Sequence, residues 1–488
     1  MTNAQPKALY YLMATQGFAS FSFYVMLTLF VLYLTGERGY GDSEAFLIFG
    51  AYAAFAYLTN VGGGLLADRL LGFRRCIHIG LLLVSAGYFL LLSDSPWVIF
   101  IALGTAAVGG GFFGSNIAAM LGSFYVENDI RRDSGYTYFY MGINVGALAA
   151  MVSAGIVATQ IDYKAAFAMS GVGALLALVS FLAGQRHYGD SGYIPAGSSL
   201  GREGPHRLGT VLALGGACLL AVGGIALLIR FNLVGGQILA LCTVSLVGYF
   251  IYEMVKETKE VRLRLYAFLI LVLFAVIFGA IYRQTNSSVV LYIARDVDLD
   301  VMGILVPPSD VGSLNPLFIL ILAPVFAIAW RRLAAVGRAV SSPAKFALAL
   351  LFLGAGYLVL RLGGLVTGAE EEASLGWVVF FYLLHTMGEL CLSPIGLAMA
   401  AALAPPRLAG FAMGLWMLSI SSSDYVAGLI SRWAEIPEGT GLSGSRQIYE
   451  SAFFDYGWIA IVAGLVLACL VPILKRLMGD RAVGGQPT

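Results

Sequence analysis

Charged residues are scarce in this sequence: they make up 12% of 488 residues. Water-soluble domains carry about 25% charged residues, so the composition excludes an ordinary soluble domain. Hydrophobic residues account for 59% of the chain. The net charge of +1 argues against a nucleic-acid partner and leaves the substrate open.

Residue groups that carry enzyme or metal chemistry are also missing. The sequence holds no metal-ligand cluster, no nucleophile with a neighbouring base and no phosphate-cradling loop. The cysteines have neither zinc nor redox spacing, and we interpret them as packed free thiols. They are Cys76, Cys218, Cys242, Cys391 and Cys469. We therefore predict no enzyme activity, no cofactor and no metal.

Apolar runs long enough to cross a bilayer, which takes about 20 residues, recur along the whole chain. They predict an all-α membrane protein with fourteen transmembrane helices, parsed as six, two and six. Twelve or thirteen helices remain open, if the middle pair lies in the interface or one run is miscounted. The runs lie near residues 8–34, 45–67, 76–93, 96–122, 137–159, 164–185, 208–229, 234–254, 264–294, 315–330, 344–364, 375–400, 408–432 and 453–474.

Lysine and arginine cluster in alternate loops, which predicts the orientation. With the N-terminus in the cytoplasm, the inside segments are basic and the outside loops hold acids such as Asp296, Asp298 and Asp300. Both termini are then cytoplasmic. The Gly/Ser/Pro-rich segment Gln185–Arg207 is interpreted as a cytoplasmic linker. Three parts follow: residues 1–186, a linker with two extra helices at 187–263, and residues 264–488.

The loop after the second run combines glycines with Asp68, Arg69, Arg74 and Arg75. At a cytoplasmic helix end, these charges can form a breakable latch of ion pairs and helix dipoles that gates transport. A plain basic loop is the alternative. The order G…D-R…G-x-R-R resembles the loop between helices 2 and 3 of the major facilitator superfamily.

Three further segments resemble the proton-coupled oligopeptide transporter family. Residues 139–146 (F-Y-M-G-I-N-V-G) are similar to the signature F-Y-x-x-I-N-x-G. Residues 313–318 (S-L-N-P-L-F) and 385–397 (H-T-M-G-E-L-C-L-S-P-I-G-L), followed by M-G-L-W at 413–416, complete the set in the family's order. The resemblance implies a major facilitator fold, with two six-helix bundles plus two extra central helices as in bacterial members.

The same resemblance implies symport of peptides with protons by alternating access. The expected partners are a small peptide or peptide-like substrate, protons and the lipid bilayer. We expect a monomer in the bacterial cytoplasmic (inner) membrane.

Polar groups inside the apolar runs are the substrate-site candidates, because a polar group in hydrocarbon needs a partner or a wet cavity. An amide both donates and accepts, which suits a peptide backbone, although a helix–helix hydrogen bond is the alternative. By the resemblance, aromatic side chains form walls, or they simply pack. The predicted substrate-binding residues are Tyr24, Tyr57, Asn116, Asn144, Arg283, Gln284, Asn315, Glu389 and Trp416.

The sequence departs from the family where proton coupling is expected. The charges of the helix-1 motif E-x-x-E-R fall at Gln16, Ala19 and Ser20. F-K-P-N on helix 4 becomes F-G-S-N at residues 113–116, and F-E-Q on helix 7 becomes Y-R-Q at 282–284. The missing helix-4 lysine and helix-7 glutamate are the two partners of a buried pair in the family. The loss of one explains the loss of the other, because an unpaired buried charge is strongly destabilising. The family's mechanism of proton coupling therefore cannot be assigned to this sequence from the resemblance alone.

The remaining charges predict a relocated ion pair. Asp424 lies about 16 residues, or roughly 24 Å, into helix 11, at a depth comparable to that of Arg283 late in helix 7. We expect Arg283–Asp424 as the standing pair, with Glu389 binding a proton or a substrate amine; Arg283–Glu389 is the alternative. His385, four residues before Glu389, shares its helix face and either relays protons or packs.

Several functions remain open at this point. The chain is a symporter using Glu389 or Asp424, an uncoupled facilitator, or a carrier or exporter of a modified peptide or siderophore. A non-transporting receptor or assembly subunit on the same scaffold is the alternative from another class. Because the cations that would clamp a peptide's carboxylate are missing, we expect weak transport of ordinary dipeptides.

Overall fold

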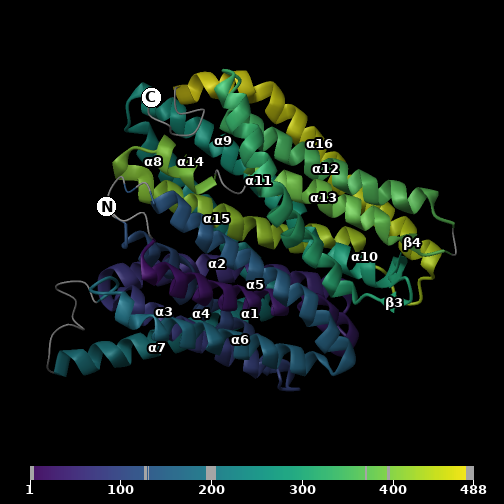
Figure 1. The fold of residues 1–488 in the computed structure, drawn as a ribbon, viewed down its shortest axis with the longest axis horizontal. Coiled ribbons are helices and arrows are strands. Elements are labelled where there is room, and N and C mark those ends of the chain that lie inside the picture. The colour runs from purple at the N-terminus through teal and green to yellow at the C-terminus, as the bar shows by residue number, and fades with distance from the viewer. Residues whose placement is uncertain are drawn as a thin grey trace. The chain divides into compact units, whose positions relative to one another are not determined.

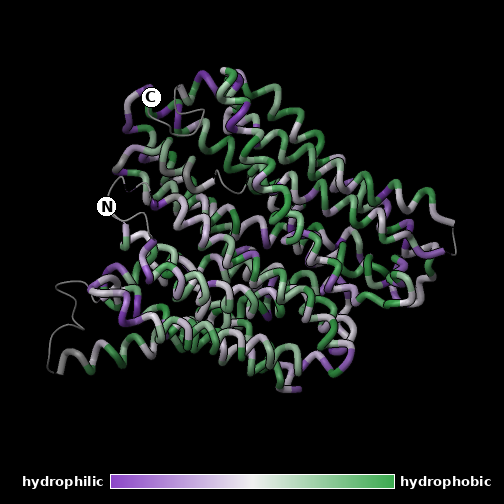
Figure 2. Tube along the Cα trace, viewed as in Figure 1, coloured by the Kyte–Doolittle hydropathy of each residue, from purple (hydrophilic) through white to green (hydrophobic). Residues whose placement is uncertain are grey.

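Helices make up most of the computed structural model, which describes residues 5–125, 129, 131–193, 205–368, 371–392 and 396–479 (Figure 1). Hydrophobic residues run along the helices, and hydrophilic residues gather mostly near their ends (Figure 2). The first seven helices are α1 (Lys7–Leu32), α2 (Asp42–Leu66), α3 (Gly72–Leu90), α4 (Pro96–Gly122), α5 (Arg132–Gln160), α6 (Tyr163–Ala183) and α7 (Pro205–Arg230).

The second part of the chain holds helices and four two-residue strands. The helices are α8 (Asn232–Val255), α9 (Lys259–Tyr282), α10 (Ser288–Asp296), α11 (Leu314–Ala335), α12 (Ser342–Val366), α13 (Leu375–Leu392), α14 (Gly396–Leu403), α15 (Pro406–Ser431) and α16 (Leu442–Met478). The strands are β1 (Val297–Asp298), β2 (Asp300–Val301), β3 (Ile304–Leu305) and β4 (Ala373–Ser374). β1 pairs in parallel with β4, and β2 pairs antiparallel with β3.

Twelve segments of the described chain are long and apolar enough to cross a membrane. One of them, Asp42–Leu90, has 49 residues and contains both α2 and α3. α15 is outside the twelve, and its serine-rich stretch at 419–424 lowers its hydropathy. Twelve of the fourteen predicted spans each correspond to one long helix, and the predicted all-α membrane fold is confirmed.

One predicted span is interrupted, and another includes residues that the structure does not describe. The run at 264–294 is not one helix, because α9 ends at Tyr282 and a 3₁₀ turn at Arg283–Asn286 separates it from α10. The run at 375–400 contains α13 and α14, and residues 393–395 between them lie outside the described residues.

Contacts along the chain divide it into two compact units. Unit 1 comprises Met1–Tyr33, Ala51–Gly235 and Ser309–Ser313, and unit 2 comprises Leu34–Gly50, Gly236–Pro308 and Leu314–Thr488. Of the two extra helices, α7 therefore groups with unit 1 and α8 with unit 2. The three-part division at residues 186 and 263 follows the chain order and stays a prediction.

Glycines allow the helices within each unit to touch. In unit 1, a Cβ at Gly146 of α5 would lie 2.0 Å from the Gly17 carbonyl oxygen of α1. In unit 2, a Cβ at Gly354 of α12 would lie 2.7 Å from the Gly457 carbonyl oxygen of α16. Any side chain at these crossings would force the backbones apart, which is the usual reason for small residues between membrane helices.

The five cysteines are free, but they are not all packed as predicted. Cys76 and Cys391 are buried, Cys218 is partly buried, and Cys242 and Cys469 are exposed. The last two lie in α8 and α16, on helix surface that the described protein leaves uncovered.

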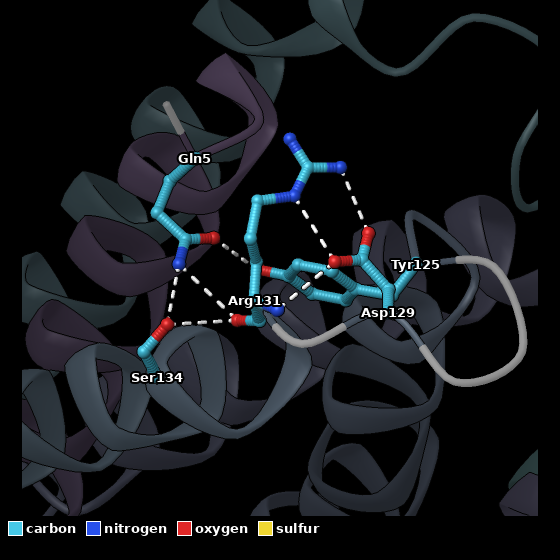
Figure 3. A network of polar contacts seen from close by, with 5 residues as sticks. All are labelled: Gln5, Tyr125, Asp129, Arg131 and Ser134. Carbon is cyan, nitrogen blue, oxygen red and sulfur yellow. Dashed lines mark hydrogen bonds and ion pairs between the residues drawn. The ribbon is translucent and has the colours of Figure 1, made fainter. Parts of the chain in front are cut away.

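A polar network fastens the start of the chain to the beginning of α5 (Figure 3). The Gln5 amide donates to the Ser134 hydroxyl at 2.7 Å and to the Arg131 carbonyl at 3.1 Å, while the Tyr125 hydroxyl donates to Gln5 at 2.9 Å. The Arg131 guanidinium and backbone amide both donate to Asp129. The Arg131 side chain is the main reason that the pKa of Asp129 lies below its ordinary value.

We expect Asp129→Asn to lower the melting temperature at neutral pH by a small, pH-dependent amount. Because the pKa of Asp129 is lower in the folded protein, its charge stabilises the fold above the ordinary carboxyl pKa, and this stabilisation is lost as pH falls through the folded value. The difference between variant and parent should be constant from neutral pH to about 5, decrease as pH falls through about 4, and vanish only once Asp129 is protonated in the folded protein as well. Thermal unfolding in detergent across this range measures it; a difference that persists unchanged at low pH would contradict the prediction.

Candidate functional site

A carboxylate held by two hydrogen bonds is the central polar feature of unit 2. Glu389 lies on α13, and its Oε2 accepts from the Tyr282 hydroxyl of α9 and from the Asn315 amide of α11, both at 2.8 Å. The same Asn315 amide donates to the Thr386 hydroxyl at 3.1 Å. Three helices thus converge on one carboxylate, and Asn315 and Glu389 of the predicted set meet directly.

His385 packs beneath this cluster. Its ring is 1% exposed and stacks on Tyr282, with centroids 4.3 Å apart and planes inclined by 20°. Its Nδ1 atom is buried without a hydrogen-bond partner among the described residues. His385 therefore positions the Tyr282 ring, and its part in a proton relay stays a prediction.

The predicted ion pair between Arg283 and Asp424 is present. Nε of Arg283 lies 2.7 Å from Oδ1 of Asp424, whose side chain is 1% exposed, whereas that of Arg283 is 20% exposed. Arg283 lies at the C-terminal end of α9, where its positive charge also interacts favourably with the negative end of the helix dipole. α15 comes close enough because Gly279 faces Ser423, whose hydroxyl would lie 2.6 Å from a Cβ at Gly279.

Gln284 has a different place from the one predicted. Its side chain is fully buried, and its amide donates to the Ala280 and Ala427 carbonyls, both at 3.0 Å. Its oxygen accepts from the Ser288 and Ser431 hydroxyls at 2.8 and 2.7 Å. Because these bonds use both ends of the amide, Gln284 joins the broken helix to α15, and we leave it out of the proposed substrate contacts.

The asparagines of unit 1 are also buried against backbone. Asn116 of α4 is 1% exposed and donates to the Gly63 and Phe112 carbonyls at 3.2 and 2.9 Å. Asn144 of α5 is 5% exposed and donates to the Tyr140 carbonyl at 3.0 Å. Asn116 thus forms a hydrogen bond between α4 and α2. The bond of Asn144 stays within its own helix, so it is not the helix–helix bond that was the alternative for Asn144.

The predicted aromatic walls differ in exposure. Tyr24 and Tyr57 are partly buried in unit 1. Trp416, in unit 2, is 6% exposed and packs edge-on against Phe346. A Cβ at Gly396 would lie 1.9 Å from its indole ring, so Trp416 is wedged into the packing. A wall role for the three side chains stays a prediction.

Two of the three positions of the missing helix-1 charges, Gln16 and Ser20, remain polar, whereas the third is Ala19. The Gln16 amide donates to the Ser20 hydroxyl at 3.3 Å, one turn apart on α1. The Gln16 oxygen is buried without a hydrogen-bond partner among the described residues. Neither side chain of this pair can take up a proton near neutral pH. These positions therefore provide no group that could couple transport to protons.

The loop between α2 and α3 forms contacts other than the predicted latch. Asp68 and Arg69 are exposed, and no ion pair of Asp68 occurs among the residues that the structure describes. Arg74 is buried and donates to the Ser191 carbonyl at 2.7 Å and to the Gly189 carbonyl. Arg74 thus fastens the start of the linker to α3, while gating by Asp68, Arg69, Arg74 and Arg75 stays a prediction.

Two contributors to the Glu389 cluster, Tyr282 and Thr386, were absent from the predicted set. Thr386 precedes Glu389 by three residues, a spacing that places both on one helix face. The break after Tyr282 also has a signal, because residues 284–288 (Q-T-N-S-S) are an unbroken polar run inside an apolar span.

Comparison with known proteins places this arrangement in a family. The sequence model of the POT family matches residues 74–443. Dipeptide and tripeptide permease A of Chromobacterium violaceum is 32% identical over 479 residues, which cover 98% of this chain and 95% of the permease. Dipeptide and tripeptide permease B of Aeromonas hydrophila is 30% identical over 97% of this chain and 94% of its own length.

Solved structures agree with the sequence relatives. The crystal structure of a peptide transporter POT in complex with sulfate has a TM-score of 0.85 and 30% identity, covering 98% of this chain and 97% of that one. A bacterial homologue of the human drug peptide transporters has a TM-score of 0.83 and 26% identity over 96% of this chain and 99% of its own. The fold, the order of motifs and the length of the match lead to one conclusion: the chain belongs to the POT family of peptide transporters.

Proposed function

We propose that this chain carries short peptides or peptide-like compounds across the cytoplasmic membrane by alternating access, and that Glu389 binds the positively charged end of the substrate. The observation that carries the proposal is the Glu389 carboxylate, held by Tyr282 and Asn315 within a membrane-spanning unit. An intramembrane carboxylate is costly to keep and marks a substrate or proton path by default. Relatives named dipeptide and tripeptide permeases support peptides as the substrate class.

We further propose that coupling to protons, where it occurs, uses unit 2. Helix 1 offers Gln16 and Ser20 where the family has charges, whereas unit 2 keeps Glu389 and the Arg283–Asp424 pair. Asp424 neutralises Arg283, so Arg283 can clamp a peptide's carboxylate only by leaving its partner. Ordinary dipeptides should therefore be held weakly at that end, in contrast to larger or modified peptides that have other contacts.

Uptake into liposomes tests this function. We expect a labelled peptide library to be taken up, faster with an imposed inward proton gradient, and dialanine to be among the poorest substrates. Protein-free liposomes and the Glu389→Gln variant are the controls. Robust uptake of dialanine at micromolar concentration would contradict the expected weak carboxylate clamp, and no uptake of any peptide would contradict the transport function.

We also propose that both termini face the cytoplasm, because lysine and arginine cluster in alternate loops. A reporter fused after Gly189 should report the cytoplasm, and one fused after Asp298 the periplasm. The same side for both fusions would contradict this topology.

A further inference from the structure

Unit 1 contains a cavity that has no place in the proposed transport path. It has a volume of about 560 Å³, within the range of roughly 300–1,000 Å³ that small-molecule sites occupy. Four helices, α2, α3, α4 and α7, form its walls. Residues that line it include Gly62, Arg75, Val108, Phe112, Gly215 and Cys218.

The cavity exists because α7 is fixed more closely at one end than at the other. Near its end, a Cβ at Gly104 of α4 would lie only 2.6 Å from the Val222 carbonyl oxygen. The Arg230 guanidinium lies 5.4 Å from the Phe100 ring centroid and 5.9 Å from that of Trp97. Toward its beginning, α7 presents Gly215 to the cavity, and a Cβ there would meet no atom within 4 Å.

The chemistry of the walls is apolar with a single charge. Three lining side chains carry a polar atom: Thr59, Cys218 and Arg75. The Thr59 hydroxyl is already used, because it donates to the Ala107 carbonyl at 2.8 Å. Arg75 forms no hydrogen bond, ion pair or ring contact among the described residues. An apolar cavity with one uncommitted guanidinium suits a molecule with a hydrocarbon chain and an anionic head.

The position of the charge along the helices matches such a molecule. Arg75 is the fourth residue of α3, next to the basic loop that ends α2, whereas Val108 and Phe112 lie near the middle of α4. The charge is therefore at the helix ends and the apolar walls extend toward the membrane interior. A peptide would have to leave its polar backbone unpaired against these walls, which is unfavourable.

We propose that this cavity binds an anionic phospholipid, with one acyl chain between α7 and α2–α4 and the phosphate on Arg75. Arginine pairs with phosphate through two parallel hydrogen bonds. The lipid fills the space that α7 leaves and joins this extra helix to the rest of unit 1. With the topology proposed above, the lipid comes from the cytoplasmic leaflet; the site does not depend on which peptide is carried.

Native mass spectrometry of the delipidated protein tests the proposal with palmitoyl-oleoyl-phosphatidylglycerol as the probe. The parent should retain one such lipid at concentrations where phosphatidylcholine with the same chains occupies about tenfold less. Gly215→Leu should narrow the cavity and weaken binding about tenfold, and Arg75→Gln should reduce binding of phosphatidylglycerol to the phosphatidylcholine level. Equal binding of the two lipids by the parent, or unchanged binding by Gly215→Leu, would overturn the proposal.

Two matched controls separate the cavity from its surroundings. Gly216 is next to Gly215 and equally open to a side chain but does not line the cavity, so Gly216→Leu should bind as the parent does. Arg69→Gln removes an exposed cation from the same loop and should leave binding unchanged. Loss of binding in either control would point to general electrostatics or helix damage and would contradict the site.

A second readout needs no substitution in the cavity. Cys218 lies in the wall, and replacing the exposed Cys242 and Cys469 with serine leaves it the most accessible thiol. Phosphatidylglycerol should slow its reaction with a maleimide about tenfold more than phosphatidylcholine does. Oleyl alcohol, which has the chain without the charge, or inorganic phosphate alone should protect it less, since each offers half of the contacts. Protection by oleyl alcohol equal to that by phosphatidylglycerol would show that the anionic head group is not recognised, and would contradict the proposal.

Discussion

Replacing Asp424 with leucine will destabilise the protein by about 3–5 kcal/mol, because Arg283 is left in the membrane without its partner. Arg283→Met should cost a similar amount, since it strands a carboxylate that is 1% exposed. The double variant should be far more stable than either single variant, because two apolar side chains replace a pair whose desolvation nearly offsets its attraction. Denaturant unfolding and folded yield in detergent measure the three changes.

The exposed pair between Lys164 and Asp94 is the matched control. Its atoms lie 2.7 Å apart, as in the buried pair, but the two side chains are 41% and 76% exposed. Asp94→Ala should cost only about 0–1 kcal/mol, because water screens the interaction. If the effects of Arg283→Met and Asp424→Leu simply add, the two residues do not act as a pair.

Transport by the double variant separates a structural pair from a functional one. A variant that folds and still carries peptide at the parental rate has lost only a stabilising contact. We expect instead that the double variant folds but transports peptide slowly. The reason is that transport needs charged groups that can exchange partners at the place where the family has a charge pair. The readout is uptake per folded molecule, so loss of yield is not counted as loss of transport.

The sequence predicted those features that depend on hydrophobicity and on single charges. Twelve of the fourteen apolar runs each correspond to one long helix, because lipid enforces run length directly. The Arg283–Asp424 pair was predictable because two charges at similar depth in one bundle have few alternatives to meeting. Asn315 and Glu389 were each identified from their presence in apolar spans, but the hydrogen bond between them was not predicted.

Features that depend on local geometry were not predictable in the same way. α9 breaks at Arg283 without a proline or glycine, and the break is maintained by Gln284 and its serine partners, which come from α10 and α15. The sequence alone could not distinguish an amide that joins helices from one that faces a substrate. Arg74 illustrates the same limit, because its partners are carbonyls of the linker more than a hundred residues away.

Glu389→Gln will leave the fold intact and reduce peptide uptake roughly 10- to 100-fold, the loss expected when one charge-assisted hydrogen bond to a substrate amine is removed. The fold should survive because a glutamine oxygen still accepts from Tyr282 and Asn315. Tyr282→Phe removes one of these donors and keeps the ring that stacks on His385, so a smaller loss, of up to about tenfold, is expected.

Two transport modes then distinguish the roles of the carboxylate. If Glu389 binds the substrate amine, Glu389→Gln impairs both proton-driven uptake and peptide exchange at equal pH on the two sides. If Glu389 only carries the proton, exchange continues at the parental rate while the response to a pH gradient disappears. Glu450, a partly buried carboxyl on α16 outside the cluster, provides the matched control, and Glu450→Gln should change neither mode. The carboxylate has two neutral donors, and Arg283 forms its ion pair with Asp424. We therefore expect the first outcome, because binding of the amine requires a negative charge and Glu389 supplies one on a membrane-spanning helix of unit 2.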